Sequence, residues 1–296
     1  MPAEWERHDA TWISWPHHEP DWPGKLEAVQ WAYAEIVRIL AEHERVEILC
    51  QTTALRDSAA QMLRAHDVAM QRVNLPLVVT DRVWLRDSGP SFVWNANGEV
   101  EIIAWDFSAW AKYENYAHDR KVPAAIQAAT GLPMTEAIRP DDRSRRLVLE
   151  GGGIEVNGHG RIIVTEEWLL SDSQVRNPGL TREDYERAFA HYLGCNDTIW
   201  LGNGCVGDDT HGHVDDIARF VNFDTVLLAY ERDPSDANHA LSVDNLARLH
   251  AAAEHQPLNV VLLPFPRAVI MNGQRLPASY ANFYIANDVV IVPTFN

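Results

Sequence analysis

The sequence predicts an α/β fold in which one unit, a hairpin followed by a helix and a strand, is repeated around a pseudo-axis. Four hairpin-like segments recur with their turns about 60 to 65 residues apart, a plausible length for one supersecondary unit. Helical patterns follow the first three hairpins, and apolar strand-like runs come next. The 296 residues are 46% apolar, which suits one large domain or two modest ones with a substantial core.

The N-terminal part alternates predicted strands and helices. The expected order is strand 11–15, helix 23–43, strand 46–50, helix 53–66 and a strand near 72–75. Proline is common in the first turn of a helix, so Pro23 is expected to lie there.

The four hairpins are expected at 90–105, 153–165, 216–230 and 280–293. The first two turn at Asn97-Gly98 and Asn157-Gly158. Because both residue types tolerate a positive φ, Asn-Gly between apolar runs is a strong hairpin signal. The third hairpin turns near 222–224 and the fourth at Asn287-Asp288.

Between the hairpins, helices are expected at about 116–129, 181–193 and 234–254, and strands at 198–201 and 259–263. Thr181 is the expected N-cap of its helix, with Glu183 and Asp184 in the first turn. The chain ends just after the fourth hairpin, where the repeat predicts a further helix and strand.

The charge of the chain favours cationic partners. With 25 Lys and Arg against 42 Asp and Glu, the formal net charge is −17, which disfavours nucleic acid and anionic membranes and attracts cations. No apolar run reaches the roughly 18 residues of a membrane span, and the N-terminus does not read as a signal peptide. Cys50, Cys195 and Cys205 show no disulfide or metal spacing, so a reducing, cytoplasmic location is expected.

Polar residues occupy equivalent places just before or inside the first strand of each hairpin. The repeat would bring them into one central pocket; they are Asp87, Glu150, His213 with Asp215, and Ser279 with Asn282. The densest run, residues 207–216, holds two histidines and four carboxylates. If the segment after Gly212 is extended, His213 and Asp215 point to the same side. An imidazole beside carboxylates can move a proton while holding a flat organic cation.

Residues 202–213 also match patterns for two other ligands, a nucleotide and a metal ion. Residues 202–207 fit G-x-G-x-x-G, but Asp208 and Asp209 follow and would repel the phosphates of a nucleotide. His211 and His213 on one strand face could begin a metal site, with His239, His250 and His255 as candidates in number only. The acidic companions fit an organic cation better, so neither metal nor cofactor is expected. A metal-dependent hydrolase built on the His-x-His-x-Asp run stays open as an alternative.

Several motifs resemble the agmatine deiminase and bacterial-type peptidylarginine deiminase family of the guanidino-group-modifying superfamily. The likeness extends over essentially the whole chain, and the motifs are Thr11 to Pro16, Trp84 to Pro90, Glu150-Gly151-Gly152, Asp209 to Asp215 and Ser279 to Tyr284. It implies a single catalytic domain over residues 1–296, a pseudosymmetric five-bladed α/β-propeller of the pentein type. The last repeat is then incomplete, without its C-terminal helix, strand and nucleophile loop.

The resemblance also implies a chemistry: hydrolysis of a guanidine to a urea and ammonia through a covalent thiouronium-type cysteine intermediate. The implied substrate is agmatine, giving N-carbamoylputrescine in polyamine synthesis. Peptidyl-arginine and free arginine are alternatives, because no residue clearly reports recognition of an α-carboxylate. A homodimer is a reasonable expectation for such an enzyme, although no interface patch is visible in the sequence.

Residue roles follow from the same resemblance. Asp87 and Asp215 would bind the guanidinium with Glu150 in support, His213 would protonate the leaving ammonia and then activate water, and Asn282 would orient the site. Trp84 and Trp105 would contact the substrate, by cation–π attraction to the cation, although core packing is the other reading for them and for Trp110. The family cysteine would lie beyond Asn296. The 296-residue chain is therefore expected to bind a guanidine weakly or poorly and not to turn it over, whereas the full-length protein would do so. A non-catalytic guanidine-binding or scaffold protein is an alternative.

Overall fold

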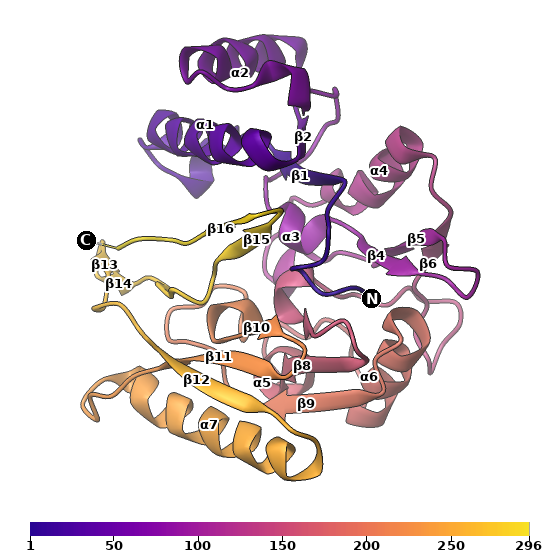
Figure 1. Ribbon diagram of the computed structural model, residues 1–296, viewed down its shortest axis with the longest axis vertical. Coiled ribbons are helices and arrows are strands. Elements are labelled where there is room, and N and C mark those ends of the chain that lie inside the picture. Colours follow the sequence, from indigo (N-terminus) through magenta and orange to yellow (C-terminus); the bar gives the residue numbers. More distant parts are fainter. Residues whose placement is uncertain (296) are drawn as a thin grey trace.

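Four three-stranded sheets and two two-stranded hairpins make up the β structure of residues 1–295, which a computed structural model describes. Helices of the repeated units lie on the outside of the molecule, whereas the short helix α3 lies near its middle (Figure 1). The predicted α/β fold is therefore confirmed.

The N-terminal sheet has the order β1-β2-β3 and is parallel throughout. Its elements are β1 (Ala10–Ser14), α1 (Leu26–His43), β2 (Arg45–Leu49), α2 (Thr53–Ala65) and β3 (Val73–Asn74). Helix α1 begins three residues later than predicted. Gly24 has a left-handed φ of 67°, so no α-helix can run from Pro23 through it, and Lys25 precedes the first helical residue.

Three further sheets repeat one pattern. In each, two strands form an antiparallel hairpin and a third strand pairs in parallel with the second, after a helical crossover. The first contains α3 (Leu85–Ser88), β4 (Ser91–Trp94), β5 (Val100–Ala104), α4 (Val122–Thr130) and β6 (Met134–Glu136). The second contains β7 (Glu155–Val156), β8 (Arg161–Thr165), α5 (Glu166–Leu170), α6 (Arg182–Ala188) and β9 (Asp197–Leu201). The third contains β10 (Ala218–Asn222), β11 (Thr225–Tyr230), α7 (Ala237–His255) and β12 (Asn259–Pro264).

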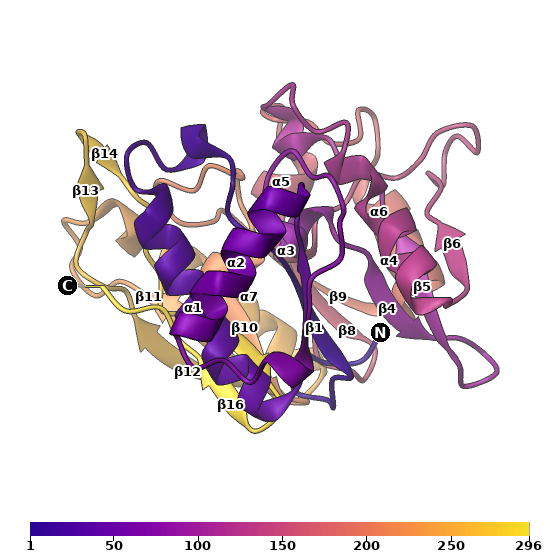
Figure 2. The ribbon, with the colours of Figure 1, turned by 90° about the horizontal axis from the view of Figure 1, so that it is seen from above.

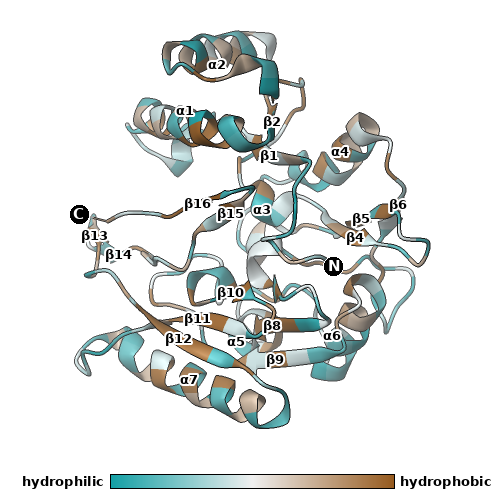
Figure 3. Cartoon of the chain, viewed as in Figure 1, coloured by the Kyte–Doolittle hydropathy of each residue, from teal (hydrophilic) through white to brown (hydrophobic). Residues whose placement is uncertain are grey.

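These strands confirm the first three predicted hairpins. Gly98 and Gly158, the glycines of the two Asn-Gly turns, have φ values of 76° and 75°, the conformation that the turn requires. Apolar side chains of β5, β8, β9, β10 and β11 are buried between neighbouring sheets and against the crossover helices, whereas Val261 and Leu262 of β12 are exposed. In Figure 3, β11 and β12 are largely hydrophobic, whereas α7 alternates hydrophilic and hydrophobic residues along its length.

Two short hairpins close the described chain: β13 (Ile270–Met271) with β14 (Gln274–Arg275), and β15 (Tyr284–Ala286) with β16 (Val289–Ile291). The second of these is the fourth predicted hairpin, with shorter strands than expected. Ala286 packs in the same core cluster as Trp15 and Val37, so the C-terminal hairpin lies against the N-terminal unit. Figures 1 and 2 both place β16 beside α1. Among residues 1–295, no helix combines the length and the apolar character that crossing a bilayer requires.

The predicted cap of α6 is a complete capping box. The Thr181 side chain accepts the backbone N–H of Asp184, whose carboxylate accepts the backbone N–H of Thr181 at 2.9 Å. We expect Thr181→Ala to lower the free energy of unfolding by about 1 kcal/mol, because the backbone N–H of Asp184 loses its side-chain acceptor. Urea unfolding measures this. Thr130→Ala, at the exposed C-terminal end of α4, is the control and should change it by less than about 0.5 kcal/mol. Equal effects would contradict the capping role.

Candidate functional site

Three tight turns meet in the middle of the molecule and carry the predicted site residues. Asp87 lies in α3, Glu150 immediately precedes the 3-10 turn Gly151–Gly153, and His213 immediately precedes the 3-10 turn Val214–Asp216. The glycine turn contacts both of the others. The expectation of an extended segment after Gly212 was wrong, because Val214–Asp216 is helical in its hydrogen bonding.

Gly152 is the point on which the site side chains converge. A methyl group placed on its Cα would lie 2.6 Å from Nδ1 of His213, 2.8 Å from Oδ1 of Asp87 and 2.9 Å from Oδ2 of Asp215. Glycine is therefore required here for close approach, and its backbone has no left-handed φ. The turn brings His213 and Asp215 to the same glycine, as predicted, but by turn geometry rather than by the alternation of a strand.

Asp87 is buried and has both carboxylate oxygens occupied. Oδ2 accepts the indole N–H of Trp110 at 3.0 Å, and Oδ1 accepts the backbone N–H of Gly152 at 3.1 Å. Oδ1 also lies 3.7 Å from Nδ1 of His213. Burial raises the pKa of Asp87 above its usual range; the charge of His213 opposes this shift and that of Glu150 adds to it.

Glu150 is fully buried and forms an ion pair with Arg176. Its oxygens accept the indole N–H of Trp168 at 2.6 Å and the Nε–H of Arg176 at 3.2 Å, and Oε2 lies 3.4 Å from Nε2 of His213. Burial by itself would raise the pKa of Glu150, but Arg176 and His213 outweigh it and lower the pKa. Sequence reasoning missed Arg176, because its loop, residues 171–180, matches none of the motifs used.

His213 lies between carboxylates on both sides of its ring. Burial would lower its pKa, but Asp87, Glu150 and Asp215 together raise the pKa to about 9. The folded protein therefore binds the His213 proton more tightly than the unfolded chain does. The stability that this provides is complete below the ordinary histidine pKa and is lost as the pH rises through about 9. At neutral pH His213 is an imidazolium, a proton donor in place.

Asp215 completes the set and is the member most open to solvent. Burial, offset by His213 and increased by Asp87, raises its pKa to about 6, so it is ionised at neutral pH. If every carboxyl group is ionised, Asp87, Glu150 and Asp215 carry −3 and His213 and Arg176 carry +2, a sum of −1; burial raises the pKa of Asp87 and so opposes its ionisation. One bound monovalent cation neutralises this cluster.

The other predicted site residues lie at different distances from this cluster. Asn282 donates from Nδ2 to Asp216 at 3.0 Å, next to Asp215, and none of its hydrogen bonds reaches the cluster itself. Trp84 is 41% exposed, and its ring lies 5.7 Å from that of Trp22. Trp105 is a correction: it is 3% exposed in the core, where its indole N–H is bonded to Ser91. It therefore belongs to the packed interior rather than to a surface that a substrate could touch.

The side chains of His211 and His213 contact different partners. Nε2 of His211 lies 3.0 Å from the Ser171 hydroxyl and Nδ1 lies 3.7 Å from Glu167, away from the partners of His213. Within the part of the chain that the structure describes, no group of three or more His, Cys, Asp or Glu side chains is arranged to hold a metal ion.

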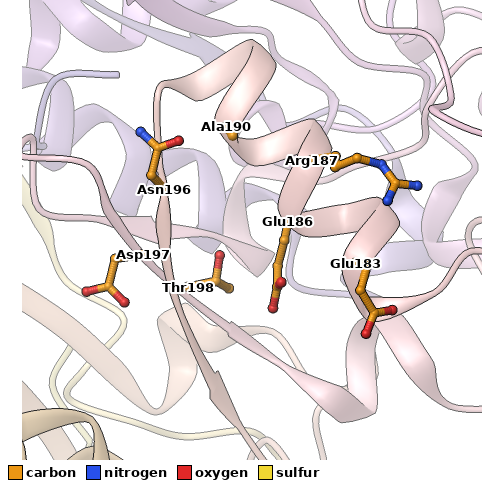
Figure 4. Close-up of a pocket in the computed structure, with 7 residues that line it drawn as sticks. All are labelled: Glu183, Glu186, Arg187, Ala190, Asn196, Asp197 and Thr198. Atoms are coloured by element: carbon orange, nitrogen blue, oxygen red, sulfur yellow. The ribbon is translucent and has the colours of Figure 1, made fainter. Parts of the chain in front are cut away.

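A hollow on the surface between α6 and β9 holds none of this chemistry. Its lining, drawn in Figure 4, is Glu183, Glu186, Arg187, Ala190, Asn196, Asp197 and Thr198. Two of its carboxylates already have partners: Glu186 accepts the indole N–H of Trp200, and Asp197 pairs with Arg161.

Comparison with known proteins gives consistent relatives. The family described as Porphyromonas-type peptidyl-arginine deiminase matches residues 1–296. Two curated relatives named "Putative agmatine deiminase" are 32% identical (Legionella pneumophila, strain Paris) and 34% identical (Selenomonas ruminantium); the alignments cover 100% of this chain and 82% and 83% of those proteins. The solved agmatine deiminase of Enterococcus faecalis has 28% identity and a TM-score of 0.85 over 100% of this chain and 83% of its own. A cysteine-to-serine variant of the C. jejuni enzyme with substrate bound has 25% identity and a TM-score of 0.84 over 100% and 82%.

Proposed function

We propose, since this chain belongs to the Porphyromonas-type peptidyl-arginine deiminase family, that its site hydrolyses a guanidino group and that agmatine is the substrate. One observation carries the proposal: the side chains of His213, Asp87 and Asp215 converge on Gly152. Glu150, which is paired with Arg176, contacts the other nitrogen of the His213 ring. A guanidinium is flat, carries one positive charge and presents forked N–H groups that match carboxylates bidentately. The names of the agmatine deiminase relatives support this choice of substrate.

In the proposed mechanism, Asp87 and Asp215 bind the N–H groups of the guanidinium around its central carbon. A thiolate attacks that carbon, a C–S bond forms, and one C–N bond then breaks. His213 gives its proton to the departing nitrogen, which leaves as ammonia. The neutral imidazole next takes a proton from water as the water oxygen attacks the same carbon. The C–S bond breaks, the thiolate is restored, the remaining proton of the water passes to solvent, and N-carbamoylputrescine leaves. Glu150 holds the His213 ring in place throughout.

We propose that the thiolate is supplied from beyond Asn296. Burial raises the pKa of both Cys50 and Cys195 to about 11. Burial and the nearby carboxylates, of which Asp216 is the first, raise the pKa of Cys205 well above its usual value. All three thiols are therefore protonated near neutral pH and poor nucleophiles.

The repeat supports the same proposal. The β15–β16 hairpin has no parallel third strand among residues 1–295, whereas the three hairpins before it are each followed by a helix and such a strand. Val290 and Val292 are 51% and 48% exposed on and after β16, where a following strand and helix would cover them. With that unit added, five sheets would form the five blades of a propeller. The cytoplasmic location and the homodimer are part of the same proposal.

The first test is binding. We expect agmatine to bind the 296-residue chain in isothermal titration calorimetry, and putrescine, which lacks the guanidine, to bind far more weakly. Asp87→Asn should weaken agmatine binding at least about tenfold, because a charge-assisted hydrogen-bond pair is lost. Asp9→Asn, at an exposed carboxylate outside the site, is the matched control and should bind as the unaltered chain does. Equal binding of agmatine and putrescine would overturn guanidine recognition.

The second test is turnover, measured as ammonia released from agmatine, arginine and an arginine-containing peptide. Release is expected only from a chain that continues past Asn296, and fastest from agmatine. Ammonia release by the 296-residue chain would refute the proposal that the nucleophile lies beyond Asn296. A higher kcat/KM for arginine or the peptide would reassign the substrate while leaving the chemistry intact.

A further inference from the structure

Trp110 lies in a turn of three consecutive residues with left-handed backbone conformations. The φ angles are 46° at Ala109, 59° at Trp110 and 51° at Ala111, and none of the three is glycine. Steric repulsion between Cβ and the backbone disfavours this conformation for every residue except glycine. A run of three therefore persists only where its surroundings hold it, and such strain gathers at functional sites.

Gln174 and Asp209, from two neighbouring loops, hold this turn in place. Nε2 of Gln174 donates to the carbonyl oxygen of Trp110 at 2.9 Å and to that of Asp209 at 3.2 Å. The Asp209 carboxylate accepts the hydroxyl of Tyr113 at 2.6 Å and pairs with Lys112. We call these contacts of Gln174, Tyr113 and Lys112 the Asp209 clasp. They tie the middle of the strained turn and the two residues that follow it to Gln174 and Asp209.

The clasp places the Trp110 indole against the substrate-binding carboxylate. The ring is 4% exposed, and the rings of Phe107 and Tyr113 pack edge-on against it at centroid distances of 5.4 and 5.9 Å. Its Nε1–H donates to Oδ2 of Asp87. The other oxygen is held separately by the backbone N–H of Gly152. Two donors from different elements thus fix the plane of the Asp87 carboxylate.

We infer that Trp110 is a positioning residue: its indole N–H holds the Asp87 carboxylate in the plane that grips a guanidinium, and the Asp209 clasp keeps the strained turn in place. This inference rests on the proposed function, because gripping a guanidinium is the step that it serves. A rotated carboxylate could not offer both oxygens to the forked N–H groups, and a misplaced polar group loses much of its effect in a buried site.

The inference has a consequence for pH dependence. The ionisable groups that face Asp87 are His213, Glu150 and Asp215. Burial raises the pKa of Asp87; His213 and the two N–H donors lower it, and Glu150 raises it. Removing the Trp110 N–H therefore raises this pKa further. Only the ionised form of Asp87 binds the cation. As the pH is lowered, the variant should therefore lose cation binding at a higher pH than the unaltered chain does.

The test is Trp110→Phe, which keeps an aromatic ring and removes the N–H. We expect agmatine binding at pH 7 to weaken about tenfold, with the acid midpoint of binding moved to higher pH. Calorimetric titrations from pH 5 to 8 measure both quantities. Trp105→Phe is the matched control, since it removes the indole N–H bonded to Ser91 in the core. It should lower the thermal stability without moving the midpoint.

The outcomes separate this inference from the proposed function. If the unaltered chain does not bind agmatine, the proposed function fails. If it binds and Trp110→Phe binds equally with the same acid midpoint, only the role of Trp110 is overturned. Should circular dichroism show that Trp110→Phe is unfolded, Asp209→Asn decides, because Asp209 is exposed and loosens the clasp from outside. Weaker agmatine binding in that variant supports the inference, and unchanged binding overturns it.

Discussion

Gly152→Ala is expected to weaken agmatine binding by about a hundredfold or more. The added methyl group would lie within 3 Å of polar atoms of His213, Asp87 and Asp215, so at least two of these side chains must move. Displacements on the order of 1 Å in such a site cost about a hundredfold. Calorimetry of agmatine binding and thermal unfolding should both be measured, because the loss is expected mainly in binding.

The control for this variant is Gly98→Ala in the β4–β5 turn. Gly98 has a φ of 76° and nothing within 4 Å of an added methyl group, so the substitution strains the backbone far from the site. It should destabilise the fold by about 1 kcal/mol and leave agmatine binding unchanged. If Gly152→Ala binds agmatine as tightly as Gly98→Ala does, the convergence of the three side chains on Gly152 is not a binding site.

Arg219→Met is expected to lower the free energy of unfolding by about 3 to 5 kcal/mol, the largest stability effect that we predict. Arg219 is 1% exposed and pairs with Glu155 at 2.8 Å and with Glu4 at 2.7 Å, while Nη1 donates to the carbonyl oxygen of Phe283 at 2.5 Å. Its loss leaves the buried Glu155 and the partly buried Glu4 without this cation, although Glu4 keeps its ion pair with Arg86. Urea unfolding measures the change, and Arg187→Met, which removes an exposed guanidinium paired with Asp184, should cost less than about 1 kcal/mol.

The size of the Arg219→Met effect should depend on pH. Burial raises the pKa of Glu155 to about 7 even with Arg219 present, and removing the cation raises it further. A carboxyl group whose folded pKa is raised stabilises the fold at low pH, and this contribution is lost as the pH rises through the folded value. The variant should therefore be less destabilised at pH 5.5 than at pH 8. A loss that is the same at both values would contradict the assignment to Glu155.

The sequence predicts which polar residues lie together, because residues at equivalent places in successive repeats are brought to the same side of the fold. Asp87, Glu150, His213 and Asp215 were found in this way. The partners that complete the site, Arg176 and Trp168, had no such signal, since a nonrepetitive loop and a helix outside the hairpin pattern carry them.

The backbone conformation of the turns around the site was harder to predict than which residues lie there. The turn at Ala109–Ala111 contains no glycine, so nothing in the sequence predicts its left-handed backbone; the Asp209 clasp sets it from outside. The 3-10 turn at Val214–Asp216 leads directly into a strand, which made the whole segment read as extended. In both places tertiary contacts override local preference.

Glu4 contacts residues far away along the chain, and this has a consequence for biosynthesis. Its carboxylate accepts the backbone N–H of Ile285 at 2.9 Å, across 281 residues, and also pairs with Arg86 and Arg219. Loop closure over such a separation is slow. The contacts of Glu4 with Arg86, Arg219 and Ile285 therefore cannot all form on a nascent chain until Ile285 has left the ribosome.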